Sequence, residues 1–116
     1  MRICIPIQAE TDEAAKCLIA RAFAVADMVE LRLDRMRAPD LHDLLHNLPG
    51  TVLVTNRRRE EGGAYSRSES ERIERLEAAV ALGAQYVDVE AATDRELIAR
   101  VKEKIKDTFH SSKGVD

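Results

Sequence analysis

The sequence predicts an α/β fold of four consecutive strand–helix units in which all strands run parallel. Four short runs rich in Val, Ile and Leu have strand length, and each is followed by a longer segment with apolar residues at helical spacing. Strands that alternate with helices pair in parallel, because each connecting helix crosses one face of the sheet. The strand-like runs are residues 3–9, 28–33, 52–56 and 86–89.

Each predicted helix follows a residue that can cap its free backbone N–H groups. The first is predicted over residues 12–26 after Thr11, and a second, short helix over residues 41–47 after Asp40. The third and fourth open with capping boxes, Ser68-x-x-Glu71 and Thr93-x-x-Glu96. We expect a single partial domain over residues 1–116, with residues 107–116 as a candidate start of a fifth strand.

Composition excludes several classes of protein. A chain of 116 residues suits one domain, and its net charge of −3 argues against a nucleic-acid partner, which needs a basic face. No run approaches the roughly 20 apolar residues of a membrane span, and the amino end leads straight into a strand-like run rather than a signal peptide. The two cysteines form neither a disulfide framework nor a metal pattern. These features predict a soluble cytoplasmic protein without a metal.

Charged residues recur on one face of three predicted strands. Side chains alternate between the two faces of a strand, so each of these strands has one aliphatic face and one charged face. A doubly wound sheet needs apolar residues on both faces, whereas the inside of a (β/α)8 barrel tolerates polar groups near the carboxyl ends of its strands. The pattern therefore favours half of a (β/α)8 TIM barrel. The charged residues are Glu30, Arg32, Arg57, Asp88 and Glu90.

Two interpretations of this charged face stay open. The charges balance in sign, so they could form a ring of structural salt bridges that compensates their burial. Their gathering on three strands instead favours a site for a polar or anionic ligand. Arg32 and Arg57 suit a substrate carboxylate, because a guanidinium binds a carboxylate through two parallel hydrogen bonds.

Four segments stand out together, in order and with plausible spacing. The most recognisable is a Glu-x-Arg-x-Asp signature at Glu30, Arg32 and Asp34. The others are the first strand Ile3-Cys4-Ile5-Pro6-Ile7-Gln8-Ala9, the third strand Val54-Thr55-Asn56-Arg57 with the glycine loop Glu61-Gly62-Gly63, and the fourth strand Gly83-Ala84-Gln85-Tyr86-Val87-Asp88-Val89-Glu90. As a set, these segments resemble the type I 3-dehydroquinate dehydratases.

The resemblance implies a barrel enzyme that converts 3-dehydroquinate to 3-dehydroshikimate and water in the shikimate pathway, with no cofactor. A lysine forms a Schiff base with the substrate ketone, and a histidine acts as general acid and base. By the resemblance, Glu30, Arg32 and Arg57 bind substrate, and Glu61 orients the catalytic histidine. The resemblance also makes the strand-four acids Asp88 and Glu90 supporting residues. The site residues that it implies are thus Glu30, Arg32, Arg57, Glu61, Asp88 and Glu90.

The chain departs from the family at three places. Pro6 stands where some members have a serine, and His110 in Thr108-Phe109-His110-Ser111-Ser112 is the nearest candidate for the catalytic histidine. The reactive lysine has no counterpart, so we expect the chain alone to be inactive, as a truncated dehydratase. The alternative is a non-catalytic half-barrel that binds a ligand or serves a structural role. Either form predicts a homodimer or a need for the missing half, since half a barrel leaves its strand edges open.

Overall fold

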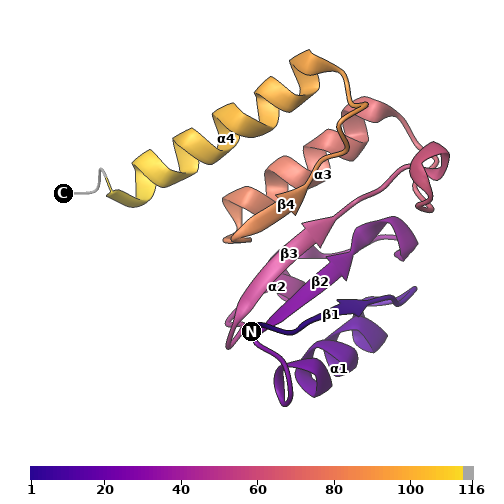
Figure 1. The fold of residues 1–116 in the computed structure, drawn as a ribbon, viewed down its shortest axis with the longest axis vertical. Coiled ribbons are helices and arrows are strands. Elements are labelled where there is room, and N and C mark those ends of the chain that lie inside the picture. The colour runs from indigo at the N-terminus through magenta and orange to yellow at the C-terminus, as the bar shows by residue number, and fades with distance from the viewer. Residues whose placement is uncertain (114–116) are drawn as a thin grey trace.

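The computed structural model describes residues 1–113, and for residues 110–113 it describes the backbone alone. Four parallel strands form one sheet in the order β1-β2-β3-β4 (Figure 1). Each strand therefore pairs with its neighbour in sequence, as in a barrel wall. The strands are β1 (Cys4–Ile7), β2 (Met28–Arg32), β3 (Thr51–Thr55) and β4 (Tyr86–Asp88).

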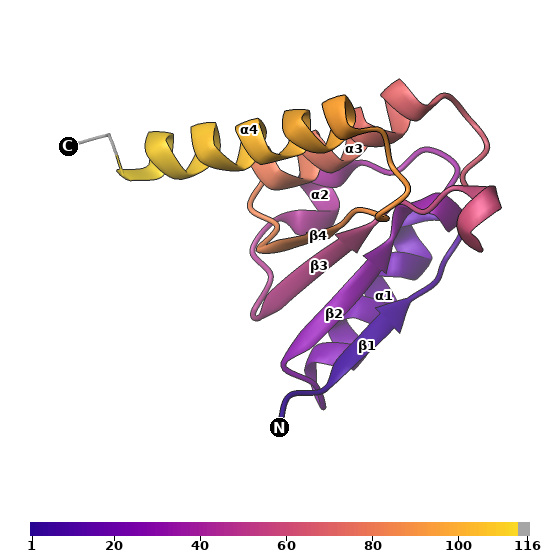
Figure 2. The same cartoon turned by 45° about the horizontal axis from the view of Figure 1, so that its top comes forward.

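Helices connect the strands and lie on one side of the sheet (Figures 1 and 2). This arrangement confirms the predicted fold of four strand–helix units. Two short 3-10 turns, η1 and η2, follow β2 and β3 at the carboxyl end of the sheet. The elements are α1 (Asp12–Phe23), η1 (Leu33–Arg35), α2 (Leu41–Leu45), η2 (Arg59–Glu61), α3 (Glu69–Ala81) and α4 (Arg95–Lys113).

The hydrophobic core lies between the helices and the outer face of the sheet. The aliphatic residues that alternate along β2 and β3 are almost completely buried there, and the apolar stripes of α1 and α3 cover them. These buried residues are Val29, Leu31, Val52 and Val54 on the strands, and Ala15, Ile19, Ile73 and Leu76 on the helices.

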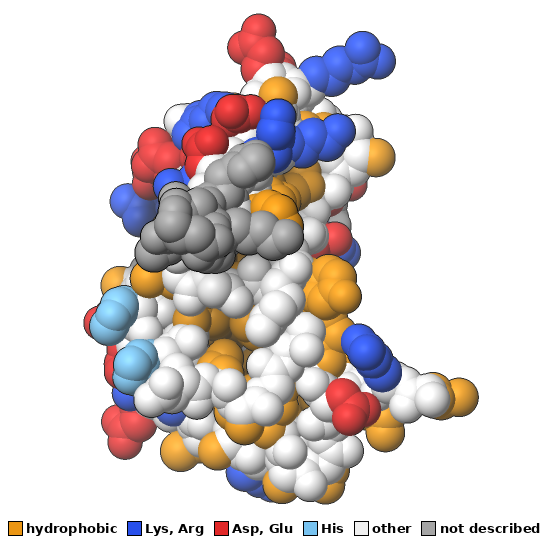
Figure 3. Space-filling model, turned by 90° about the vertical axis from the view of Figure 1, so that its left-hand side faces the viewer, with side chains coloured by type: hydrophobic (Ala, Val, Ile, Leu, Met, Phe, Trp, Pro, Cys, Tyr) orange, Lys and Arg blue, Asp and Glu red, His pale blue; other side chains and the backbone are white. Residues whose placement is uncertain are grey.

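The opposite, inner face of the sheet has no covering layer within residues 1–113. Cys4 and Pro6 of β1 are exposed, Leu53 of β3 is half-buried, and Tyr86 of β4 is 52% exposed. Figure 3 views the molecule from the end at which the strands begin, and hydrophobic side chains appear there among the surface atoms. No helix in the described part of the chain is long and apolar enough to cross a membrane.

Three of the four predicted helix caps are confirmed. The side chains of Thr11, Asp40 and Ser68 each accept a hydrogen bond from a backbone N–H in the first turn of the following helix. The fourth prediction is wrong. The carboxylate of Asp94 accepts the hydrogen bond from the N–H of Glu96, while Thr93 is buried and directed elsewhere.

The carboxyl-terminal segment also differs from expectation. Residues 107–113 continue α4 and do not begin a fifth strand. The apolar residues of α4 recur at helical spacing through this segment, so the helix that packs on α3 simply extends. Residues 114–116, the end of the expected strand, lie outside the described residues.

Candidate functional site

Arg57 lies just beyond the end of β3 and is the centre of an ion-pair cluster. Its Nη2 donates to Oδ2 of Asp88 at 2.7 Å, and its Nε lies 3.5 Å from Oε1 of Glu90. The parallel register explains the contact, because Thr55, two residues before Arg57, pairs with Asp88 on β4. The hydrogen bond that Arg57 donates to Asp88 and the surrounding negative charge raise the pKa of Arg57, which keeps the guanidinium charged.

Glu30 lies on the same inner face, one strand away. Its Oε2 accepts a hydrogen bond of 2.6 Å from the hydroxyl of Thr55. Its charge is also close enough to Arg57 to favour the charged guanidinium. The strand alternation thus brings Glu30, Arg57, Asp88 and Glu90 to one face, as predicted from the sequence.

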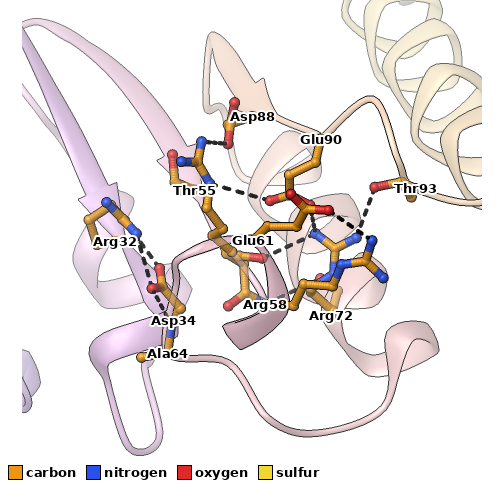
Figure 4. A network of polar contacts seen from close by, with 12 residues as sticks. Arg32, Asp34, Thr55, Arg58, Glu61, Ala64, Arg72, Asp88, Glu90 and Thr93 are labelled. Atoms are coloured by element: carbon orange, nitrogen blue, oxygen red, sulfur yellow. Dashed lines mark hydrogen bonds and ion pairs between the residues drawn. The ribbon is translucent and has the colours of Figure 1, made fainter.

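Arg32 at the end of β2 is directed toward Asp34 rather than toward Arg57 and its partners. Its Nε and Nη2 donate to the two carboxylate oxygens of Asp34 at 3.2 and 3.1 Å. Asp34, whose side chain is fully buried, also accepts a hydrogen bond from the backbone N–H of Ala64 at 3.0 Å. Figure 4 shows how this pair ties β2 to the loop that follows β3.

Arg72 of α3 supports the site from the helical layer. Its side chain is fully buried, and its Nη1 donates to Oε2 of Glu90 at 2.8 Å (Figure 4). The same guanidinium binds both carboxylate oxygens of Glu69, the hydroxyl of Thr93 and the backbone carbonyl of Asn56. Glu90 therefore lies between two guanidinium groups, with only 9% of its side chain exposed.

Glu61 lies on η2, within the glycine loop. Its carboxylate pairs with Arg58 at 3.3 Å, and Arg58 also approaches Glu69 at 3.6 Å. The backbone of His110 lies in α4, but its side chain is outside the described residues. The catalytic roles assigned to Glu61 and His110 stay predictions.

Neither the remaining histidines nor the described lysines lie at this site. His42 and His46 stack on each other at 5.8 Å beside α2, and no three potential ligand residues gather as a metal site in the part of the chain that is described. Lys16 on α1 pairs with Asp43, and the other described lysines are on α4. The α4 lysines with described side chains are Lys102, Lys104 and Lys106, and Lys113 is described by its backbone alone.

Sequence reasoning missed Arg72 and the pairing role of Asp34. Arg72 stands beside the apolar Ile73 in an amphipathic helix, where a charged residue ordinarily faces solvent. One signal was available: Arg72 and Glu69 stand three residues apart, a spacing at which helical side chains meet. In the sequence, Asp34 stands out only as part of the strand-two signature.

The Glu69–Arg72 pair predicts a specific pH dependence of stability. Hydrogen bonding to Arg72 lowers the pKa of Glu69 in the folded state. A lowered folded-state pKa adds stability above the unfolded value of about 4.3, and that stability is lost as the pH falls through the folded value. Glu69→Gln should therefore flatten the loss of stability below about pH 4.3, measured by urea unfolding at a series of pH values.

Glu103→Gln is the matched control for that measurement. Glu103 is exposed on α4 and makes no ion pair with any residue in the described range. Its substitution should leave the slope of stability against pH unchanged. Equal slopes for the Glu69→Gln variant and the unmodified chain would contradict the prediction.

Half of a (β/α)8 barrel, with paired charges where its strands end, places the chain among the barrel proteins whose sites lie at the carboxyl ends of the strands. The type I 3-dehydroquinase family profile matches residues 3–113. The chain belongs to this family, as its sequence segments predicted.

Individual proteins similar to this chain belong to the same family. The 3-dehydroquinate dehydratase of Methanothermobacter thermautotrophicus is 38% identical over 104 residues, which are 86% of this chain and 47% of that protein. The 3-dehydroquinate dehydratase structure from Geobacillus kaustophilus superposes with a TM-score of 0.77 at 25% identity, over 92% of this chain and 46% of that one. The structure from Aquifex aeolicus gives 0.72 at 27% identity, over 94% and 49%. The chain thus spans about half the length of these relatives.

Proposed function

We propose that this chain supplies the substrate-binding half of a type I 3-dehydroquinate dehydratase site. The observation that carries the proposal is the position of Arg57. Its side chain is 35% exposed at the carboxyl end of the sheet, and Asp88 and Glu90 orient its guanidinium. Arg57 is thereby fixed in place by its partners and still reachable by a ligand.

The chemistry of 3-dehydroquinate matches this surface. The molecule carries a carboxylate, hydroxyl groups and a ketone. A guanidinium such as Arg57 can bind the carboxylate, and the carboxylate of Glu30 can accept hydrogen bonds from hydroxyl groups. Arg32, held by Asp34, borders the same site at the end of β2.

The dehydration itself needs two further groups. In the proposed reaction a lysine amine condenses with the ketone, and the resulting iminium draws electrons so that the neighbouring proton can be removed. A histidine takes that proton and later returns one to the leaving hydroxyl, which departs as water. Glu61 would orient this histidine, for which His110 is the candidate. No described lysine lies on the inner face of the sheet, so a lysine must come from outside residues 1–109.

Binding of quinate, which has the carboxylate and hydroxyl groups but no ketone, tests the proposal. We expect calorimetry or NMR titration to detect binding to the chain, and Arg57→Met to weaken it about 10- to 100-fold. That range corresponds to losing a hydrogen bond to a charged group, about 1.5–3 kcal/mol. Arg100→Met is the control, because Arg100 pairs with Glu77 in the helical layer. Equal affinities for the two variants would contradict the proposal.

We expect the chain alone to form no Schiff base. Incubation with 3-dehydroquinate and borohydride should leave the intact mass unchanged, because the described amines lie on α1 and α4 or at the amino terminus. A stoichiometric adduct would show that a lysine of this chain reaches the site. The mass of the peptide that carries the adduct would then identify that lysine.

A purely structural role for the charged face is the second candidate. One observation favours this role. Arg32 donates both of its parallel hydrogen bonds to Asp34, and the same two donors would otherwise be able to bind a substrate carboxylate. A chain that binds no quinate, but loses stability on Arg57→Met, would support this role. A cytoplasmic location and a homodimer stay predictions.

A further inference from the structure

Glu90 lies between two guanidinium groups and binds them unequally. Its Oε2 accepts a hydrogen bond of 2.8 Å from Nη1 of Arg72, whereas its Oε1 lies 3.5 Å from Nε of Arg57. In the part of the chain that the structure describes, neither Oε1 of Glu90 nor Nε of Arg57 has a hydrogen-bond partner, although both atoms are buried. The carboxylate is therefore held by Arg72 and stops short of Arg57.

Arg72 can hold Glu90 in this position because its own guanidinium is fixed by other groups. The side chain is fully buried, and its Nε and Nη2 donate to the two carboxylate oxygens of Glu69 at 2.7 and 3.1 Å. Nη1 also donates to the backbone carbonyl of Asn56. Figure 4 shows the same guanidinium directed toward Glu90 and Thr93. Glu90 is thus attached to the helical layer behind the sheet.

The charge of Arg57 is only partly neutralised as a result. Asp88 accepts a hydrogen bond from Arg57 at 2.7 Å, and Asp88 raises the pKa of Arg57 more than Glu90 does. Two carboxylates in full contact with one guanidinium would leave a net negative charge, which repels an anion. Because Arg72 holds Glu90 back, the half-exposed Arg57 can still attract one.

Without Arg72, Glu90 would form the hydrogen bond that it lacks. A buried carboxylate that loses its hydrogen-bonded cation is strongly destabilised, and Arg57 is the other cation beside it. A shift of about 0.7 Å would bring Oε1 of Glu90 and Nε of Arg57 from 3.5 Å to about 2.8 Å, the usual length of a charge-assisted hydrogen bond. Asp88 and Glu90 would then both be bound to Arg57.

We propose that Arg72 is the residue that allows Arg57 to accept an anionic ligand. Arg72 acts through Glu90, because its hydrogen bond keeps this carboxylate from closing on Nε of Arg57. The inference rests on the proposed function, in which the ligand group is a carboxylate. Arg72 is fully buried in the helical layer and does not meet the ligand, so it is a positioning residue that makes the site selective for negative charge.

Titration with quinate measures the effect on binding. Arg72→Met should weaken quinate binding about 10-fold, because Glu90 then takes up a hydrogen bond to the charged guanidinium of Arg57. The double variant Arg72→Met/Glu90→Gln should recover most of this loss, because the competing carboxylate is gone. Arg100→Met also removes one positive charge from the helical layer and should leave the affinity unchanged. A double variant that binds as weakly as Arg72→Met would overturn the inference.

The Nε–H resonance of Arg57 in the heteronuclear NMR spectrum tests the same movement without ligand. Its absence from the Arg57→Met spectrum assigns it. In Arg72→Met the resonance should move downfield and exchange more slowly with water, because a hydrogen bond to Glu90 has formed, and in the double variant it should return. An unchanged resonance in Arg72→Met would overturn the inference, whether or not quinate binds. A shifted resonance in a chain that binds no quinate would instead count against the proposed function alone.

Glu90→Gln provides the test if circular dichroism shows that Arg72→Met does not fold. In this variant Arg72 keeps its two hydrogen bonds to Glu69, and Asp88 still holds Arg57. Glu90→Gln should bind quinate at least as tightly as the unmodified chain does, because a neutral group replaces the competing carboxylate. Weaker binding would mean that the charge of Glu90 is itself needed to hold Arg57 in place, and that result would contradict the inference.

Discussion

Arg72→Met should lower the free energy of unfolding by about 3–5 kcal/mol, which is the effect of removing one partner from a buried ion pair. Arg72 is fully buried and donates to Glu69, Glu90, Thr93 and the carbonyl of Asn56. Its removal leaves Glu90 nearly buried with only the longer contact to Arg57. Urea unfolding followed by circular dichroism measures the loss.

Two further variants separate the contribution of ion pairing to stability from the contribution of side-chain packing. Arg100→Met removes a partly exposed guanidinium that pairs with Glu77, and should cost at most about 1 kcal/mol. The double variant Arg72→Met/Glu90→Gln should recover part of the stability, because the uncompensated charge is gone. If Arg72→Met lowers the free energy of unfolding by no more than Arg100→Met does, the buried charge of Glu90 does not depend on Arg72 for its compensation.

The fold was predictable from sequence because its signals are local and repeated. Alternating aliphatic residues such as Val29 and Leu31 on β2 identify the buried face of a strand, and helical spacing identifies α1 and α3. The shared face of Glu30 and Arg57 follows from the same alternation together with parallel order. These predictions need no knowledge of long-range contacts.

What sequence reasoning missed depends on contacts between distant elements. Thr93 was expected to cap α4, but its hydroxyl accepts a hydrogen bond from Arg72, 21 residues earlier in the chain. Arg72 is buried only because Glu69, Glu90 and Thr93 all contact it. No periodic pattern in the sequence predicts that these residues meet. The candidate start of a fifth strand at residues 107–116 is wrong over residues 107–113, because the helical spacing of apolar residues in α4 continues there.

The glycine loop after β3 also depends on contacts that sequence patterns do not reveal. A substitution in this loop is expected to have the second large effect on stability. Gly63→Ala should lower the free energy of unfolding by about 3 kcal/mol or more, the upper range for overpacking. A Cβ at Gly63 would lie 2.0 Å from the carbonyl oxygen of Arg57 and 2.5 Å from its carbonyl carbon. Backbone atoms cannot move aside like the end of a flexible side chain, so the loop must shift.

That shift should also disturb the site. The loop folds back on β3 through hydrogen bonds from the N–H of Tyr65 to Arg57 and from the N–H of Gly63 to Arg58. Displacing it moves Arg57 away from Asp88, so the Gly63→Ala variant should lose quinate affinity as well as stability. Urea unfolding and calorimetry on the same preparation measure the two effects.

Gly62→Ala is the matched control, since it makes the same change one residue earlier. Gly62 has a φ of +85°, and a Cβ there would meet nothing within 4 Å. The cost is then only the left-handed conformation, about 1–2 kcal/mol, with no displacement of Arg57 and no loss of quinate affinity. If Gly62→Ala proved as damaging as Gly63→Ala in both measurements, backbone conformation rather than close approach would explain the glycines. Arg57 would then owe its position to Asp88 and Glu90 rather than to the loop.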